Sequence, residues 1–211
     1  MRIAVIGAGG KAGNEITAEA LNRGHEVTAI VRDAAKVKDS RAAILVKDIF
    51  ALTSADLQPF DVVVNAFGAP FGQEHLHVDA GNVLIDALKN TPDTRLIVVG
   101  GAGSLYTDET RSQKVAEAPG FPDFVKPTAL NQARNLEILQ GTSGLKWTFV
   151  SPSATFAEGE RKGAYAAGKD QLLFNSKGES YVSYADYAIA IVDEIERPQH
   201  IGERFTVVSE S

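Results

Sequence analysis

Residues 1–13 read MRIAVIGAGGKAG, and this stretch sets the expected fold. An apolar run from Ile3 to Ile6 meets glycines at positions 7, 9, 10 and 13, and a helical pattern starts at once. This order predicts a strand, a tight glycine turn and a helix N-terminus, where N–H groups and the helix dipole attract a phosphate. We therefore expect the turn to bind the pyrophosphate of a dinucleotide, through Gly7, Gly9, Gly10, Lys11, Ala12 and Gly13.

The glycine spacing departs from the G-x-G-x-x-G of the standard dehydrogenase fingerprint. It permits G-x-x-G-x-x-G through Gly7, Gly10 and Gly13, or G-x-G-x-x-x-G through Gly7, Gly9 and Gly13. Both spacings are typical of the short-chain dehydrogenase/reductase superfamily. A plain strand-to-helix turn is the alternative interpretation of the glycines alone.

Composition and charge narrow the class of protein. The chain has 211 residues, 44% of them hydrophobic and 23% charged, which is ordinary for one globular α/β domain spanning residues 1–211. A net charge of −6 argues against nucleic acid as a partner, and no apolar window is long enough to predict a membrane span. The absence of cysteine excludes disulfides and thiol nucleophiles. A core strand from the N-terminus leaves no room for a signal peptide, so a cytoplasmic location is the default expectation.

Apolar runs alternate with helical patterns along most of the chain. The patterns predict strands at 2–6, 26–31, 43–46, 61–65, 95–99, 146–151 and 204–208, and helices at 12–22, 34–38, 54–57, 78–89, 128–140 and 184–196. This alternation predicts a Rossmann-like, doubly wound parallel sheet of about seven strands with helices on both faces. Ligands bind such sheets beyond the carboxyl ends of the strands. Residues 156–182 are expected to form a small flap of hairpin-like elements over this crevice.

Two charged positions bear on the identity of the cofactor. Arg32 directly follows the second predicted strand and precedes Asp33. An acid at this position accepts a hydrogen bond from the ribose of NAD, whereas an arginine pairs with the 2′-phosphate of NADP. The order favours NADP(H) over NAD(H), with a solvated surface arginine as the alternative. Asp48 ends the third predicted strand, where it either contacts the adenine or caps a helix.

Small residues follow the fourth and fifth predicted strands. Ala66, Phe67 and Gly68 are expected to lie against the ribose and pyrophosphate, unless they form a simple turn. Gly100 and Gly101 end the fifth strand, beside the expected position of the nicotinamide.

The catalytic residues are less well indicated. Classical short-chain dehydrogenases combine a serine after the fifth strand with a Tyr-x-x-x-Lys helix, in which the tyrosine is the acid or base. Ser104 stands where a hydroxyl would reach the substrate, but the predicted helix that follows it has no such tyrosine and lysine. Tyr165 and Lys169 have the spacing but lie in the expected flap. Lys126 either contacts the cofactor ribose or is a solvated residue before a helix. His75 and His77 are two positions apart and would point to different faces of a helix, so we expect no metal site.

Several stretches together resemble a known group. IGAGGKAG, VTAIVRD, NAFGAP and WTFVSPSATFAEGERKGAY followed by SYADYAIAIVDEIE are similar to atypical short-chain dehydrogenases/reductases. The chain resembles the bacterial predicted NADH-flavin reductases, within the NmrA-like and biliverdin reductase B-like NAD(P)-binding proteins, over its whole length. The resemblance implies that Ser151, Pro152 and Ser153 border the nicotinamide. It also implies tyrosine-independent hydride transfer to a flavin, quinone or similar aromatic acceptor.

Other functions stay open from the sequence. The NmrA-like resemblance allows a non-catalytic dinucleotide sensor that binds regulatory proteins. An epimerase or dehydratase is disfavoured because the Tyr-x-x-x-Lys motif is missing after the fifth predicted strand, where the catalytic pair is expected. A crevice lined by Phe67, Phe71, Tyr106 and Phe156 would favour a planar acceptor, although these rings serve equally well as core packing. The sequence is compatible with a homodimer.

Overall fold

A computed structural model describes residues 1–210 of the chain. Its strands are β1 (Arg2–Ile6), β2 (Glu26–Val31), β3 (Ala43–Val46), β4 (Val62–Asn65), β5 (Arg95–Val99), β6 (Trp147–Ser151), β7 (Thr155–Ala157), β8 (Tyr165–Gly168), β9 (Tyr181–Ser183) and β10 (Glu203–Ser209). Its α-helices are α1 (Lys11–Asn22), α2 (Ser54–Leu57), α3 (Leu76–Leu88), α4 (Lys126–Gln140) and α5 (Tyr184–Glu196). Short 3₁₀ helices lie at η1 (Ala34–Lys36), η2 (Ile49–Ala51), η3 (Ala102–Ser104) and η4 (Val115–Glu117).

The predicted doubly wound sheet is confirmed. Within residues 1–210 the main sheet has eight strands in the order β3-β2-β1-β4-β5-β6-β10-β8, and all neighbours from β3 to β10 pair in parallel. The strand order reverses between β1 and β4, and this switch point is where such sheets bind their ligands. The glycine turn after β1 therefore lies at the switch point.

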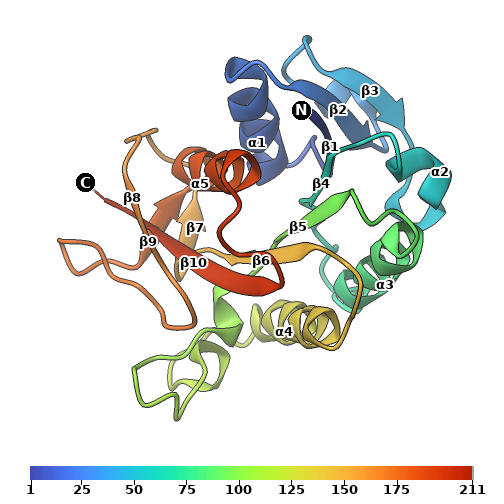
Figure 1. Cartoon of the computed structure of the whole chain (residues 1–211). Coiled ribbons are helices and arrows are strands. Elements are labelled where there is room, and N and C mark those ends of the chain that lie inside the picture. Colours follow the sequence, from blue (N-terminus) through green and yellow to red (C-terminus); the bar gives the residue numbers. More distant parts are fainter. Residues whose placement is uncertain (211) are drawn as a thin grey trace.

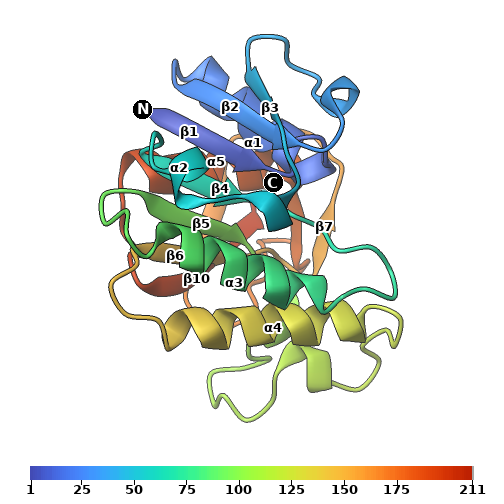
Figure 2. The same ribbon diagram turned by 90° about the vertical axis from the view of Figure 1, so that its right-hand side faces the viewer.

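Helices cover both faces of the sheet (Figure 1). Helices α1 and α5 pack together on one face, where Val5, Ile191 and the fully buried Tyr187 belong to one apolar cluster. Helices α3 and α4 run side by side along the other face (Figure 2), over a cluster that includes Leu84 and Phe149. Burial on both faces explains the continuous Val62–Val64 run of β4. Among residues 1–210, none of the helices has the length and apolar character needed to cross a membrane.

The segment 156–182 contains short strands, as expected, but they do not pair as hairpins. Strand β7 pairs in parallel with β9, and β8 pairs antiparallel with β10. Strand β8 therefore extends the main sheet as an eighth strand. It supplies partners for the outer edge of β10, which would otherwise expose a row of unpaired backbone groups.

Candidate functional site

The turn after β1 accepts only glycine at two positions. Gly7 has φ +76°, and a Cβ added there would lie 2.5 Å from the carbonyl oxygen of Ala66. A Cβ on Gly13 would lie 2.2 Å from the carbonyl oxygen of Gly7. The turn is therefore pressed against both the loop after β4 and the first turn of α1, so its backbone stays exposed to a ligand.

The N-terminus of α1 is bare. Its N-cap, Gly10, has no side chain to accept a hydrogen bond, and the first turn holds no acidic residue. The amide of Asn14 donates to the carbonyl of Gly10 at 2.9 Å, but among residues 1–210 the amides of Lys11, Ala12 and Gly13 have no acceptor. Three N–H donors and the positive end of the helix dipole are thus free to bind an anion.

A cleft of about 490 Å³ opens in front of this turn. Its lining includes every cofactor residue predicted from the first four strands, namely Gly7, Gly9, Gly10, Lys11, Ala12, Gly13, Arg32, Asp48, Ala66, Phe67 and Gly68. The loops after β1, β2, β3 and β4 supply them, as expected for the carboxyl ends of neighbouring parallel strands. A volume of this size accommodates part of a dinucleotide.

Basic side chains cluster at the end of the cleft that is formed by the loops after β2 and β3. Arg32 is exposed and has no polar partner among residues 1–210, whereas Asp33 accepts a hydrogen bond from the amide of Ala35 at 3.0 Å and caps η1. Lys36 and Lys47 also line the cleft, and Lys47 pairs with Asp56 at 2.6 Å. The carboxylate beside Arg32 is thus already used by the fold, which leaves the arginine available to an anionic ligand.

Asp48 caps a short helix, the second of the two roles that the sequence left open. One carboxylate oxygen accepts a hydrogen bond from the amide of Phe50 at 2.9 Å and caps η2. The same residue lines the cleft, so capping does not remove it from the site.

An aromatic row supports the wall of the cleft at Phe67. The Phe67 ring makes edge-to-face contacts with Phe50 at 5.8 Å and with His77 at 5.9 Å between ring centres. Nε2 of His77 accepts a hydrogen bond from the amide of Ala69 at 3.5 Å. Burial lowers the pKa of His77 below its ordinary value, and the nearby carboxylate of Glu74 only partly opposes this effect. The neutral ring therefore holds the loop after β4.

This histidine predicts a pH dependence of stability. Because the folded-state pKa of His77 is lowered, its stabilisation is complete above the unfolded-state pKa of 6.5 and is lost as pH falls through the folded-state pKa. Between about pH 7.5 and pH 5.5, the wild-type Tm should fall about 2 °C more than that of His77→Gln, which keeps an acceptor but does not titrate. Differential scanning calorimetry tests this, and equal decreases in the two proteins would contradict it.

The residues predicted for the nicotinamide end lie outside the lining of this cleft. Gly100 lies against the ring of Phe149, and a Cβ on Gly101 would lie 2.1 Å from the side-chain oxygen of Gln132. Ser151, Pro152 and Ser153 are buried at the carboxyl end of β6, and Ser153 donates a hydrogen bond to the carbonyl of Val207 at 2.8 Å.

The two candidate catalytic residues also lie outside the cleft lining. The Ser104 hydroxyl is buried and accepts a hydrogen bond at 3.1 Å from Arg204, which also donates to Asp170 at 2.7 Å. Lys126 is exposed at the first position of α4. Of the four aromatic residues considered for an acceptor, Phe67 and Phe156 line the cleft, whereas Phe71 and Tyr106 do not.

The sequence interpretation missed several residues that line the cleft. These are Ile6, Ile30, Val31, Lys36, Lys47 and Tyr184, whereas Asp33 and Ile49 also line the cleft and belong to the loops 32–33 and 48–49, which the parallel sheet predicts at the crevice. For Lys36 and Lys47 a signal was present, because both lie within a few residues of a strand end that faces the site. Tyr184 and Phe156 come from the second half of the chain, and their rings meet edge to face at 4.5 Å.

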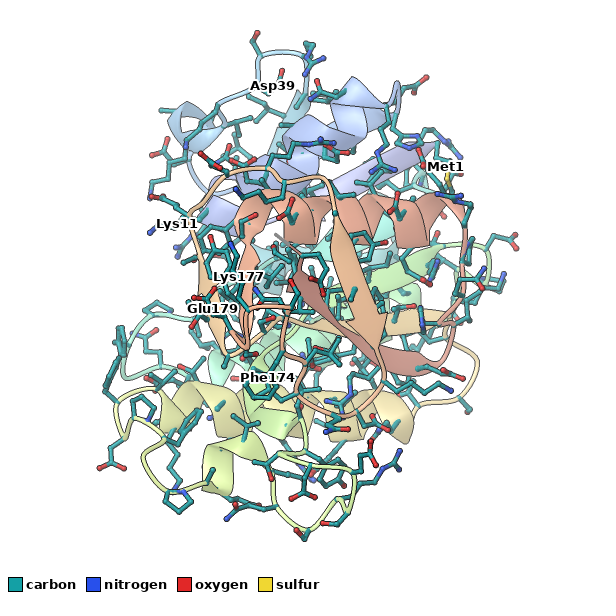
Figure 3. The ribbon with its side chains drawn as sticks, turned by 90° about the vertical axis from the view of Figure 1, so that its left-hand side faces the viewer. Met1, Lys11, Asp39, Phe174, Lys177 and Glu179 are labelled. Atoms are coloured by element: carbon teal, nitrogen blue, oxygen red, sulfur yellow. The ribbon has the colours of Figure 1, made fainter. Side chains whose placement is uncertain are left out.

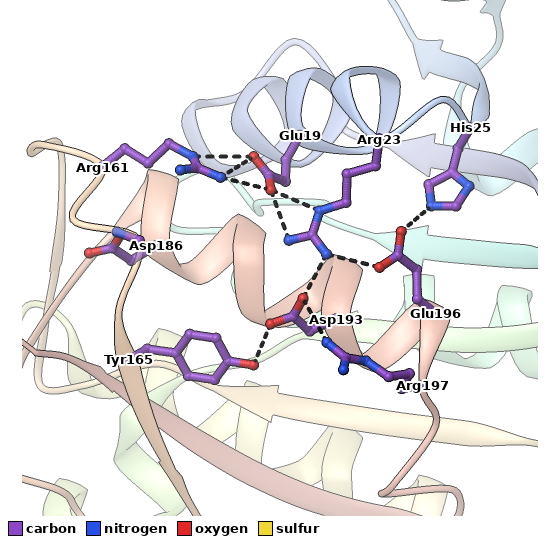
Figure 4. Close-up of polar contacts among 10 residues, drawn as sticks. Glu19, Arg23, His25, Arg161, Tyr165, Asp186, Asp193, Glu196 and Arg197 are labelled. Carbon is purple, nitrogen blue, oxygen red and sulfur yellow. Dashed lines mark hydrogen bonds and ion pairs between the residues drawn. The ribbon is translucent and has the colours of Figure 1, made fainter.

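The loop after β7 is fastened to α1 at two points. Glu158 pairs with Lys11 at 3.7 Å, at the mouth of the cleft. Arg161 binds Glu19 at 3.0 Å, and Glu19 also binds Arg23 (Figure 4). In the view of Figure 3, Lys11 lies along the same edge of the molecule as the β8–β9 loop. Two ion pairs thus join residues that are far apart in the sequence, and one of them includes Lys11 of the cleft lining.

The Lys11–Glu158 pair should compete with an anionic ligand for Lys11. Both side chains are exposed, so we expect Glu158→Gln to lower the Kd for NADPH only about twofold at low salt, with no difference at high salt. Glu160→Gln is the matched control, because Glu160 pairs with Lys162 at 2.8 Å and does not line the cleft. Fluorescence titration measures both variants, and an identical change in the two would contradict a specific role for Glu158.

Comparison with known proteins shows the family of the chain. A family model described as NAD(P)H-binding matches residues 7–198. The chain is 59% identical to the uncharacterized protein YwnB of Bacillus subtilis (strain 168), with 100% of both chains covered. A crystal structure from Streptococcus pneumoniae TIGR4, provisionally named an NADH-flavin reductase, is 45% identical with a TM-score of 0.94 over 99% of each chain.

A second similar structure has a name from another class of enzyme. This protein from Bacteroides thetaiotaomicron, provisionally named an epimerase, is 32% identical with a TM-score of 0.87, over 100% of this chain and 97% of that chain. The fold is thus common to relatives whose names differ in the reaction. The chain belongs to the NAD(P)H-binding protein family.

Proposed function

We propose that the protein is an NAD(P)H-dependent reductase that uses NADPH in preference to NADH and delivers hydride directly to a flavin, a quinone or a similar aromatic acceptor. The bare α1 N-terminus carries the proposal, with the free amides of Lys11, Ala12 and Gly13 facing a cleft that also holds Arg32. The relative from S. pneumoniae that is provisionally named an NADH-flavin reductase supports the choice of a flavin.

Each part of the cleft has a role in holding the cofactor. The three amides bind the pyrophosphate, and Arg32 with Lys36 binds the 2′-phosphate that distinguishes NADP from NAD. Asp48 faces the adenine, and Phe67 supports the ribose side. When bound, NADPH supplies the hydride.

The choice of an aromatic acceptor follows from the acid and base residues that are missing at the expected positions. Helix α4, which follows β5, carries no Tyr-x-x-x-Lys pair, and the Ser104 hydroxyl already accepts a hydrogen bond from Arg204. Tyr165 and Lys169 have this spacing, but they belong to the β8 segment, where the Tyr165 hydroxyl donates to Asp193. Reduction of an electron-poor aromatic ring needs little proton transfer from the protein, so orientation and exclusion of water suffice. We place the nicotinamide toward Gly100, Gly101 and the buried segment 151–153, with residues 156–182 as a cover within a single domain.

A panel of acceptors tests the proposal. We expect the purified protein to oxidise NADPH in steady state with FMN, riboflavin or a quinone, and to show a lower KM for NADPH than for NADH. A 4-ketosugar should not be reduced. Submicromolar binding of NADPH without turnover on any acceptor would favour the dinucleotide sensor instead.

A further inference from the structure

Tyr184 brings the second half of the chain into the cofactor cleft. It is the first residue of α5, it is half-buried, and it lines the same cleft as the glycine turn. Its ring is held edge to face against Phe156, whose ring also lies 4.7 Å from that of Tyr187. The phenol is therefore fixed in place by apolar contacts on its ring.

The Tyr184 hydroxyl differs from the other tyrosine hydroxyls around it. Tyr165 donates to Asp193 at 2.8 Å, Tyr187 to the carbonyl of Val150 at 2.7 Å, and Tyr181 to the carbonyl of Glu158 at 3.4 Å. The Tyr184 hydroxyl has no hydrogen-bond partner among residues 1–210. A half-buried phenol that lines a cleft and has no protein partner is a ready donor to a ligand.

The packing of α1 and α5 places Tyr184 beside the pyrophosphate turn. Both helices begin at the carboxyl edge of the sheet and pack against each other on one face (Figure 1). Arg23 lies twelve residues after Lys11 and binds Glu196 at 2.9 Å, which lies twelve residues after Tyr184 (Figure 4). Lys11 and Tyr184, the first residues of the two helices, line the same cleft, so α5 begins at the cleft that the free amides of α1 face.

We infer that the Tyr184 hydroxyl donates a hydrogen bond to the pyrophosphate of the bound dinucleotide. The inference rests on the proposed use of NAD(P)H. A phosphate oxygen is an anionic acceptor, and a hydrogen bond to a charged group contributes enough to change Kd about tenfold. Tyr184 is thus a cofactor-binding residue supplied by α5, across the cleft from the amides of α1.

Tyr184→Phe tests the inference because it removes the hydroxyl and keeps the ring against Phe156. We expect the Kd values for NADPH and for NADH each to rise about tenfold in isothermal titration calorimetry, since both dinucleotides carry the pyrophosphate. The Tm of the ligand-free protein should not change. Tyr181→Phe is the matched control, and its Kd values should stay within about twofold of wild type because its hydroxyl binds Glu158 instead.

Two results would overturn the inference. The first is that Tyr184→Phe binds both dinucleotides as tightly as the wild type does. The second is that it loses affinity for NADPH alone, which would place the hydroxyl at the 2′-phosphate. A wild-type protein that binds neither dinucleotide would instead refute the proposed function itself.

Discussion

Replacing Arg32 with aspartate is expected to raise the Kd for NADPH about 100-fold and to change the Kd for NADH less than about threefold. Arg32 is exposed in the cleft without a partner, so the substitution removes an ion pair with the 2′-phosphate and adds a like charge. Each factor of ten corresponds to about 1.4 kcal/mol, and a charge-assisted pair together with a repulsion accounts for two such factors. Titration of each dinucleotide against wild type and variant measures the effect.

Lys38→Asp controls for the change in net charge. Lys38 is exposed nearby but does not line the cleft, and only its backbone amide is used, in a 3.1 Å hydrogen bond to Asn14. We expect this variant to weaken NADPH binding only a few-fold at low salt, through long-range repulsion that salt screens. If Arg32→Asp lost affinity for NADPH and for NADH equally, Arg32 would not be the residue that recognises the 2′-phosphate.

Gly13→Ala is expected to lower the free energy of unfolding by about 2–3 kcal/mol and to weaken the binding of both dinucleotides. The added Cβ would lie 2.2 Å from the carbonyl oxygen of Gly7 and 2.8 Å from the Cα of Ala8, and both are backbone atoms that no rotamer change can move. Helix α1 must then shift away from the turn and carry its free amides out of position. Urea unfolding gives the stability and calorimetry gives the affinities.

Gly141→Ala is the matched substitution for Gly13→Ala. Gly141 has an ordinary helical φ of −84°, and a Cβ there would meet only backbone oxygens at 3.6 and 3.7 Å. Its stability should be unchanged or raised by up to about 1 kcal/mol, through the lower entropy of the unfolded chain. If Gly13→Ala behaved in the same way, the close packing of the turn would not be needed for the fold.

The local patterns in the sequence predicted most of the architecture. The bounds of β1, β2, β3, β5, α2 and α5 agree with the structure to the residue. These elements are marked by apolar periodicity and by glycines such as Gly24, whose φ of +82° ends α1, and such signals act within a few residues. The pairing of β8 with β10 and of β7 with β9 depends on contacts between distant segments, which periodicity does not encode.

In the candidate site too, the residues in local motifs could be predicted from the sequence, and those placed by contacts between distant segments could not. Motif positions in the first four loops predicted the residues around the glycine turn, because each follows a strand whose end must face the crevice. The orientation of Ser104 was not predictable, since it depends on Arg204, 100 residues further along the chain. Tyr184 could likewise not be predicted as a site residue from the sequence. The packing of α5 against α1 brings it to the cleft, and local patterns do not encode this packing.

Anaerobic single-turnover mixing of the NADPH-loaded protein with FMN tests direct hydride delivery. We expect the absorbance of NADPH and that of oxidised FMN to fall together, with equal molar amounts of the two consumed. Deuterium on one face of the nicotinamide C4 should slow the reaction, whereas deuterium on the other face should not. NADPH that stays bound and unoxidised in the presence of FMN and of the other aromatic acceptors would contradict direct hydride delivery.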